Sequence, residues 1–195
     1  MSRGFSLLEL LVSMALIAGF ALAVHQTCTV LLRGVRVLEA ASEAQEAARI
    51  GVQLIVADAR EAGFSPSGPL RDGVRRAGPD VFAMARDLND DGDVDDSSER
   101  VTYLYAPDRR ALLRAQGDAP PQPLLADLDD DGLAFTYVGN DGVPLAAGTE
   151  LDAAARAQIR AVAVRLAIAV PNPDPSMTRP LRVEQTATAT LRNVP

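Results

Sequence analysis

Residues 5–32 read FSLLELLVSMALIAGFALAVHQTCTVLL and form the longest apolar run of the chain. The run has no proline and carries one acidic residue, Glu9. As an α-helix, residues 5–24 would be about 30 Å long, which matches the thickness of a bilayer core. This length favours a membrane-spanning helix over a buried core helix. A cleaved secretory signal is the second alternative, but its apolar region is shorter and ends at a small-residue cleavage site.

The helical pattern continues beyond the apolar run. Small and apolar residues recur at steps of three and four, which places them on one helix face. They are Leu38, Ala41, Ala44, Ala48, Val52, Ile55 and Ala59. Gly63 is placed to end the helix, because glycine readily adopts the backbone conformation of a helix C-terminus. The sequence therefore predicts one helix from about Phe5 to Ala62, with an amphipathic second half at residues 33–63.

Residues 64–195 predict a globular domain built on an antiparallel β-sheet. Residues 65–79 are rich in glycine and proline and are expected to form a loop, whereas the later segments alternate with period two. The predicted strands are 100–105, 111–114, 132–138, 160–170 and 181–191. A short helix is expected at 149–158, capped by Thr149. The predicted fold class is α+β, with the long helix packed on the sheet against the alanine-rich face of 160–170.

The composition excludes several classes of function. The chain carries 26 acidic and 19 basic residues, for a net charge of −7, so electrostatic binding to nucleic acid is not expected. All basic residues other than the single histidine are arginines, which excludes Schiff-base chemistry on lysine. His25 and Cys28 are the only histidine and cysteine, so a catalytic triad or a multi-cysteine zinc site is excluded from the soluble part. We therefore do not expect an enzyme.

An acidic turn at residues 87–100, DLNDDGDVDDSSER, follows much of the EF-hand pattern. Its candidate Ca²⁺ ligands are Asp87, Asn89, Asp91, Asp93, Asp95 and Glu99. The twelfth position of the pattern is Ser98, and Glu99 follows one residue late. Two interpretations stay open: a calcium turn, in which hard oxygen ligands surround the ion, and a solvated turn that needs no metal. Calcium is the one cofactor that the sequence suggests.

A second acidic turn lies at Asp127, Asp129 and Asp131. It carries only the front half of the same pattern, because the chain becomes apolar after Gly132 and continues as a strand. The better interpretation is a plain acidic turn before a strand, without a metal.

Residues 3–19, RGFSLLELLVSMALIAG, resemble the class III signal of type IV pilins and pseudopilins. In that family a short basic leader ends in glycine, and phenylalanine, an apolar helix and a glutamate follow at fixed spacing. The resemblance implies that residues 1–4 are a leader, that prepilin peptidase cleaves between Gly4 and Phe5, and that the Phe5 amine becomes N-methylated. The carboxylate of Glu9 is then expected to pair with the Phe5 amine of a neighbouring subunit and to set the axial register of a filament.

Residues 56–64, VADAREAGF, resemble the signature that ends the helix of PilW-like minor pilins. This resemblance implies a minor pilin that helps to prime or initiate type IV pilus assembly. Its implied partners are other minor pilins, the major pilin and prepilin peptidase. It would cross the inner membrane once, hold its C-terminal domain in the periplasm, and be incorporated into the cell-surface pilus. Two alternatives stay open: a J-type minor pseudopilin of type II secretion, and a membrane-tethered calcium-binding or adhesive module.

Overall fold

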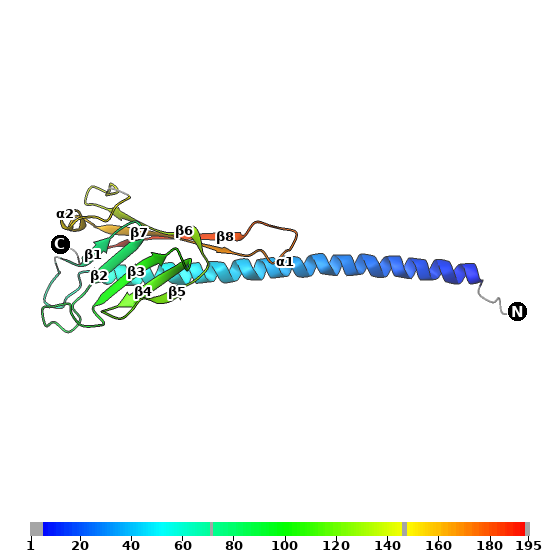
Figure 1. Cartoon of the computed structure of the whole chain (residues 1–195), viewed down its shortest axis with the longest axis horizontal. Helices are drawn as coiled ribbons and strands as arrows, with labels where there is room; N and C mark the ends of the chain where they lie inside the picture. Colours follow the sequence, from blue (N-terminus) through cyan, green and yellow to red (C-terminus); the bar gives the residue numbers. More distant parts are fainter. Residues whose placement is uncertain (1–5, 71, 146–147, 194–195) are drawn as a thin grey trace.

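The computed structural model describes residues 6–70, 72–145 and 148–193. Its dominant feature is one long helix, α1 (Leu7–Glu61), which projects far beyond the strands (Figure 1). At a rise of about 1.5 Å per residue, α1 is about 80 Å long. The predicted helix is confirmed over these residues, whereas Phe5 lies outside the described part of the chain.

Among the described residues, the strands form two antiparallel sheets rather than the single sheet expected from the sequence. The five-stranded sheet consists of β1 (Val74–Ala77), β2 (Val81–Ala85), β3 (Arg100–Ala106), β4 (Ala111–Gln116) and β5 (Gln122–Leu125). The three-stranded sheet consists of β6 (Leu128–Val138), β7 (Ala161–Val170) and β8 (Leu181–Thr190). In both sheets every strand pairs with its neighbours in sequence, so each sheet is a meander.

The second half of α1 supplies one side of the hydrophobic core. Its buried residues are Ala44, Ala48, Gly51, Val52, Ile55, Val56, Asp58 and Ala59. They pack mainly on β7 and β8 of the three-stranded sheet (Figure 1). Because half of these residues are alanine or glycine, the helix backbone can approach the sheet closely.

The expectation that the alanine-rich face of β7 meets the helix is wrong. The core contains the opposite face of β7, with Val162, Val164, Leu166 and Ile168. A Cβ atom added at Gly51 would lie 3.5 Å from Cδ1 of Leu166. Larger residues on this strand are accommodated because the small residues lie on α1 itself and at Ala189 of β8, which is 1% exposed.

Four short elements differ from the sequence prediction: the strands β1, β2 and β5, which were not predicted, and the start of α2. β1 lies inside the segment expected to be a loop, and β5 contains Pro123, which fits its place at the edge of the sheet. The short helix, α2 (Ala153–Arg156), is capped by Asp152 and not by Thr149. Asp152 Oδ1 accepts a hydrogen bond of 2.8 Å from the N–H of Ala155. The chain is still extended one residue earlier, where the N–H of Leu151 bonds to the carbonyl of Ala77 in β1.

Gly63 ends α1 as predicted and fastens the helix end to the rest of the domain. Its φ angle is +77°, in the left-handed region that favours glycine. Its N–H donates to the carbonyl of Ala85 in β2 at 2.8 Å, and its own carbonyl accepts from Leu70 at 2.9 Å. A Cβ atom at Gly63 would lie 2.4 Å from the carbonyl oxygen of Asn193. The end of α1, β2 and the C-terminal segment therefore meet at this glycine.

Candidate functional site

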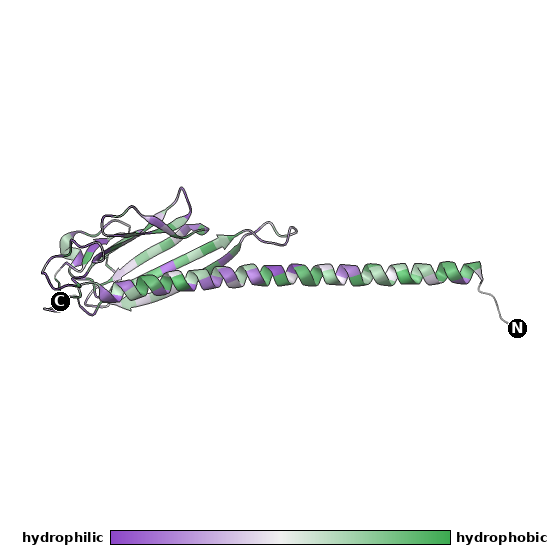
Figure 2. Ribbon diagram, turned by 90° about the horizontal axis from the view of Figure 1, so that it is seen from below, coloured by the Kyte–Doolittle hydropathy of each residue, from purple (hydrophilic) through white to green (hydrophobic). Residues whose placement is uncertain are grey.

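The first candidate site is the exposed half of α1, defined here as residues 7–36. All of these residues are exposed except Thr29, which is partly buried, and no residue of α1 before Ala44 is buried. Leu7, Leu16 and Phe20 are each about 70% exposed. Figure 2 shows apolar residues predominating toward the N-terminal end of this half. The helix is long and apolar enough to cross a membrane. So much apolar surface requires lipid or protein around it.

Glu9 lies in the first turn of α1, where a carboxylate is favoured by the partial positive charge of the helix N-terminus. It is exposed, and the ion pairs of the described residues do not include it. Its carboxylate is therefore available to a group outside this chain. Gly4 and Phe5, the expected cleavage and methylation positions, lie outside the described residues, so their processing stays a prediction.

The second candidate site is the acidic turn between β2 and β3. Asp87 and Glu99, its two ends, are 1% and 0% exposed. Asp87 accepts hydrogen bonds from the N–H groups of Asp90 and Gly92 at 2.7 and 3.3 Å. Glu99 Oε1 accepts from the N–H of Leu88 at 2.8 Å, whereas Oε2 has no partner among the described residues. The turn is thus held closed by carboxylates that point inward.

The remaining predicted calcium ligands are exposed, and most of them make local hydrogen bonds from side chain to backbone. Asn89, Asp91 and Asp93 each accept a hydrogen bond from the N–H two residues later, at 3.2, 3.1 and 2.9 Å. The amide nitrogen of Asn89 also donates to Asp91 and Asp96, at 2.8 and 2.9 Å. In residues 6–70, 72–145 and 148–193, no group of three or more His, Cys, Asp or Glu side chains is gathered as a metal site. The six predicted ligands share one turn, but their oxygens do not converge.

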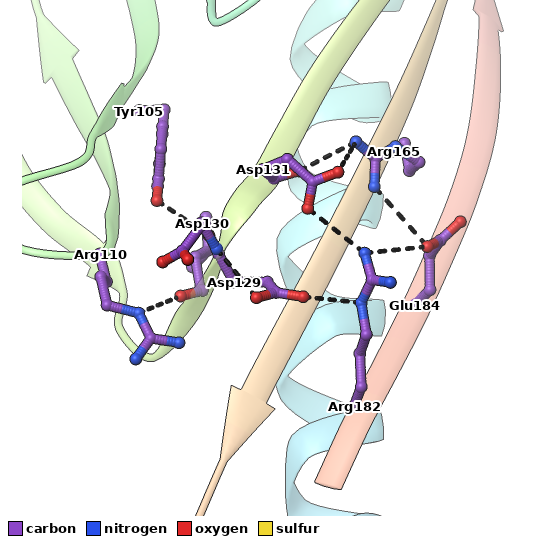
Figure 3. A network of polar contacts seen from close by, with 9 residues as sticks. Tyr105, Arg110, Asp129, Asp130, Asp131, Arg165, Arg182 and Glu184 are labelled. Atoms are coloured by element: carbon purple, nitrogen blue, oxygen red, sulfur yellow. Dashed lines mark hydrogen bonds and ion pairs between the residues drawn. The ribbon is translucent and has the colours of Figure 1, made fainter. Parts of the chain in front are cut away.

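The second acidic turn begins β6 and lies against β7 and β8 (Figure 3). Asp129 pairs with Nε of Arg182 at 2.7 Å, and Asp131 pairs with Arg182 and Arg165 at 3.3 and 3.4 Å. Both arginines also lie within 4 Å of Glu184. Arginines therefore compensate the charges of Asp129 and Asp131 within the chain, while the metal-free interpretation of this turn stays a prediction.

This network was not predicted from the sequence, because it joins residues far apart in the chain. Arg165 interrupts the alanine-rich face of β7. Arg182 and Glu184 lie two residues apart in β8, opposite Ala169 and Ala167 of that face. The available signal for this network was the presence of two arginines, Arg165 and Arg182, on strand faces that otherwise carry small or polar residues.

Comparison with known proteins supports the first candidate site. The family model for the prokaryotic N-terminal methylation motif matches residues 1–24. Among solved structures, the chain is similar to a type IV-like pilin from Thermus thermophilus, with a TM-score of 0.51 and 14% sequence identity. The match covers 76% of this chain and 95% of that one. The chain has a type IV pilin-like fold. No curated protein sequence matches it.

The pilin-like fold and the methylation motif together indicate a structural subunit and not an enzyme. In this pilin-like chain the two candidate sites lie at opposite ends. The exposed half of α1 leads away from the domain, and the acidic turn lies beside the far end of α1, where the N–H of Asp87 donates to the carbonyl of Phe64 at 2.8 Å.

Proposed function

We propose that this chain is a minor pilin that helps to prime or initiate assembly of a type IV pilus. The observation that carries the proposal is the exposed half of α1, an apolar helix surface that carries Glu9 near its start and no buried residue. The methylation motif at residues 1–24 lies at the same end of the chain. A subunit with this helix can be stored in a membrane and later transferred into a helical filament core.

The proposed sequence of events follows from the chemistry of this helix. The helix crosses the inner membrane once and the globular domain lies in the periplasm. Prepilin peptidase cleaves after Gly4, and the new amine of Phe5 is methylated. A carboxylate in hydrocarbon costs about 2.5–3.5 kcal/mol on insertion scales, so Glu9 gains from a cationic partner. The Phe5 amine of a neighbouring pilin is that partner, and only one axial offset between subunits brings the two groups together.

The signature at residues 56–64 supports a PilW-like subunit. Asp58 is buried and bonded to Tyr103 and Arg114, and Ala62 and Gly63 form the closely packed end of α1. These residues fix the direction in which α1 leaves the domain. A priming complex needs that direction to be the same in every subunit, because other minor pilins and the major pilin then pack on the exposed helices.

The test uses Glu9→Ala with Glu43→Ala as the matched control, since Glu43 is an exposed acid on the same helix beyond the apolar run. The variant chain is measured in membranes and in sheared pili. Removing the acid makes insertion easier, so the membrane content of Glu9→Ala should equal that of the wild type. Its content in pili should fall about tenfold or more, because the neighbour's amine loses its buried partner. Equal pilus content of both variants and the wild type would refute the pairing.

A deletion strain separates the pilus from the secretion alternative. Loss of surface pili with normal export of secreted enzymes supports the minor-pilin assignment. Loss of enzyme export with normal pili would instead assign the chain to a type II secretion system as a J-type pseudopilin.

A further inference from the structure

The carboxylate of Glu99 is buried and only half of it is hydrogen-bonded within the described structure. The residue is 0% exposed, and the ion pairs of the described residues do not include it. Its Oε2 atom is buried and has no hydrogen-bond partner in the described part of the chain, while Oε1 accepts from the N–H of Leu88. An isolated buried carboxylate is strongly unfavourable unless a cation compensates it.

Glu99 lies at the end of the acidic turn, and its side chain is bonded to the start of the same turn. Because Oε1 accepts from the N–H of Leu88, the carboxylate of Glu99 faces the first residues of the turn. The amide nitrogen of Asn89 bridges carboxylate oxygens of Asp91 and Asp96. An amide N–H group therefore holds together two anions that a cation would hold more strongly.

We propose that residues 87–99 form a Ca²⁺ site anchored by Oε2 of Glu99. Asp87, Asn89, Asp91 and Asp95 supply side-chain oxygens, and Asp93 supplies its carbonyl. Binding requires the Asn89 amide nitrogen to release Asp91, and the carboxylate of Asp95 to turn from Arg100, which lies 3.8 Å from it, so that the oxygens converge. Ca²⁺ suits this set, because it accepts six to eight oxygen ligands at variable geometry. Mg²⁺ demands a tight octahedron and releases its water reluctantly.

The site has a structural consequence for the domain. The backbone at Asp87 bonds to Phe64 at the end of α1, and the backbone of Glu99 bonds to Arg86, which forms an ion pair with Glu61 of α1. Calcium at this turn would therefore stabilise the end of the long helix as well as the connection between β2 and β3. This inference does not depend on the proposed role in a pilus.

The experiment uses the full chain in detergent, freed of metal with a chelator. Calcium binding is measured by isothermal titration calorimetry, and thermal unfolding is followed in chelator, in about 1 mM Ca²⁺ and in about 1 mM Mg²⁺. The variants are Glu99→Gln and Asp91→Ala. The control is Asp108→Asn, which removes an exposed acid from the turn between β3 and β4 and changes the net charge equally.

We expect one Ca²⁺ per wild-type chain and a melting temperature several degrees higher in Ca²⁺ than in chelator. Mg²⁺ should give little of this rise. Glu99→Gln should lose calcium binding yet melt in chelator no lower than the wild type, because it removes a buried charge. Asp91→Ala should bind about tenfold more weakly or worse, and Asp108→Asn should bind as the wild type does.

Three results would overturn the proposal. One is the absence of binding heat together with equal melting temperatures in chelator and Ca²⁺. Another is a Glu99→Gln chain that binds Ca²⁺ as tightly as the wild type. The third is an equal response to Mg²⁺. If Glu99→Gln does not fold, Asp91→Ala carries the same test, because Asp91 is exposed and its loss leaves the core intact.

Discussion

The hydroxyl of Tyr103 donates a hydrogen bond of 2.5 Å to Oδ2 of Asp58, which joins α1 to the middle strand of the five-stranded sheet. Arg114, on the adjacent strand β4, donates to the same oxygen at 3.0 Å. Burial, followed by the bond to Asp58, raises the pKa of Tyr103, so its hydroxyl stays a donor. α1 packs mainly on the other sheet, and this buried polar cluster adds to the apolar core that the helix shares with the five-stranded sheet.

We expect Asp58→Ala to destabilise the domain by about 3 kcal/mol, since Arg114 and Tyr103 would lose their common acceptor in a partly buried place. Tyr103→Phe should cost less, because the ion pair between Asp58 and Arg114 persists. Glu46→Ala, which breaks an exposed ion pair on the same helix, is the control and should leave the melting temperature unchanged. Melting temperatures of the three variants in detergent decide the matter. An Asp58→Ala chain as stable as the control would show that packing alone holds the helix to this sheet.

Gly63→Ala is expected to be far more damaging than Gly142→Ala. The two glycines have nearly equal φ angles, +77° and +75°, so backbone strain is similar, about 1–2 kcal/mol. At Gly63 the added Cβ would also meet the carbonyl oxygen of Asn193 at 2.4 Å, whereas at Gly142 nothing lies within 4 Å. The difference in unfolding free energy should be about 2 kcal/mol or more. Equal losses would mean that the C-terminal segment moves aside freely.

The leader at residues 1–4 should be absent from the mature chain. Intact mass measurement of the protein extracted from membranes should fit a chain that begins at N-methylated Phe5. In a strain without prepilin peptidase, the same measurement should show the uncleaved chain. A chain that begins at Met1 or Ser2 in cells with an active peptidase would contradict the proposed processing.

A truncated chain of residues 33–195 should be soluble, monomeric and cooperatively folded. No residue of α1 before Ala44 is buried, so this truncation removes exposed apolar surface and leaves the core complete. A chain of residues 60–195 is the matched comparison, because it also lacks the buried stripe from Ala44 to Ala59. That shorter chain should aggregate or fail to unfold cooperatively. Size-exclusion chromatography and calorimetry distinguish the two, and an insoluble longer fragment would place the boundary elsewhere.

The sequence was sufficient for the long elements of this fold. α1 was predictable because a proline-free apolar run continues into a stripe of period three to four that ends at Gly63. β7 and β8 were predictable because ten residues of strict alternation have few other interpretations. β1 was missed because its four residues, VRRA, carry two exposed arginines and show no alternation. The division into two sheets depends on which strands pair, and that is decided by contacts across the domain.

The candidate sites were predictable to different depths. The pattern around Glu9 is contiguous in sequence, so its spacing could be read directly. The acidic turn was visible as a set of oxygen-bearing residues, but the complete burial of Glu99 follows from how β3 packs and has no local signal. Asp58 was noticed only as part of a signature. Its partners, Tyr103 and Arg114, are 45 and 56 residues away in the sequence.

The packing of α1 on β8 sets the order in which this domain can fold. Sequential pairing makes each meander a structure of local contacts, which form quickly as the chain emerges. The helix, however, finds much of its partner surface on the last strand, more than 100 residues later, and closing so long a loop is slow. Until β8 arrives, the stripe from Ala44 to Ala59 lacks a large part of its cover. A nascent chain is therefore most prone to aggregation and proteolysis before β8 has been synthesised.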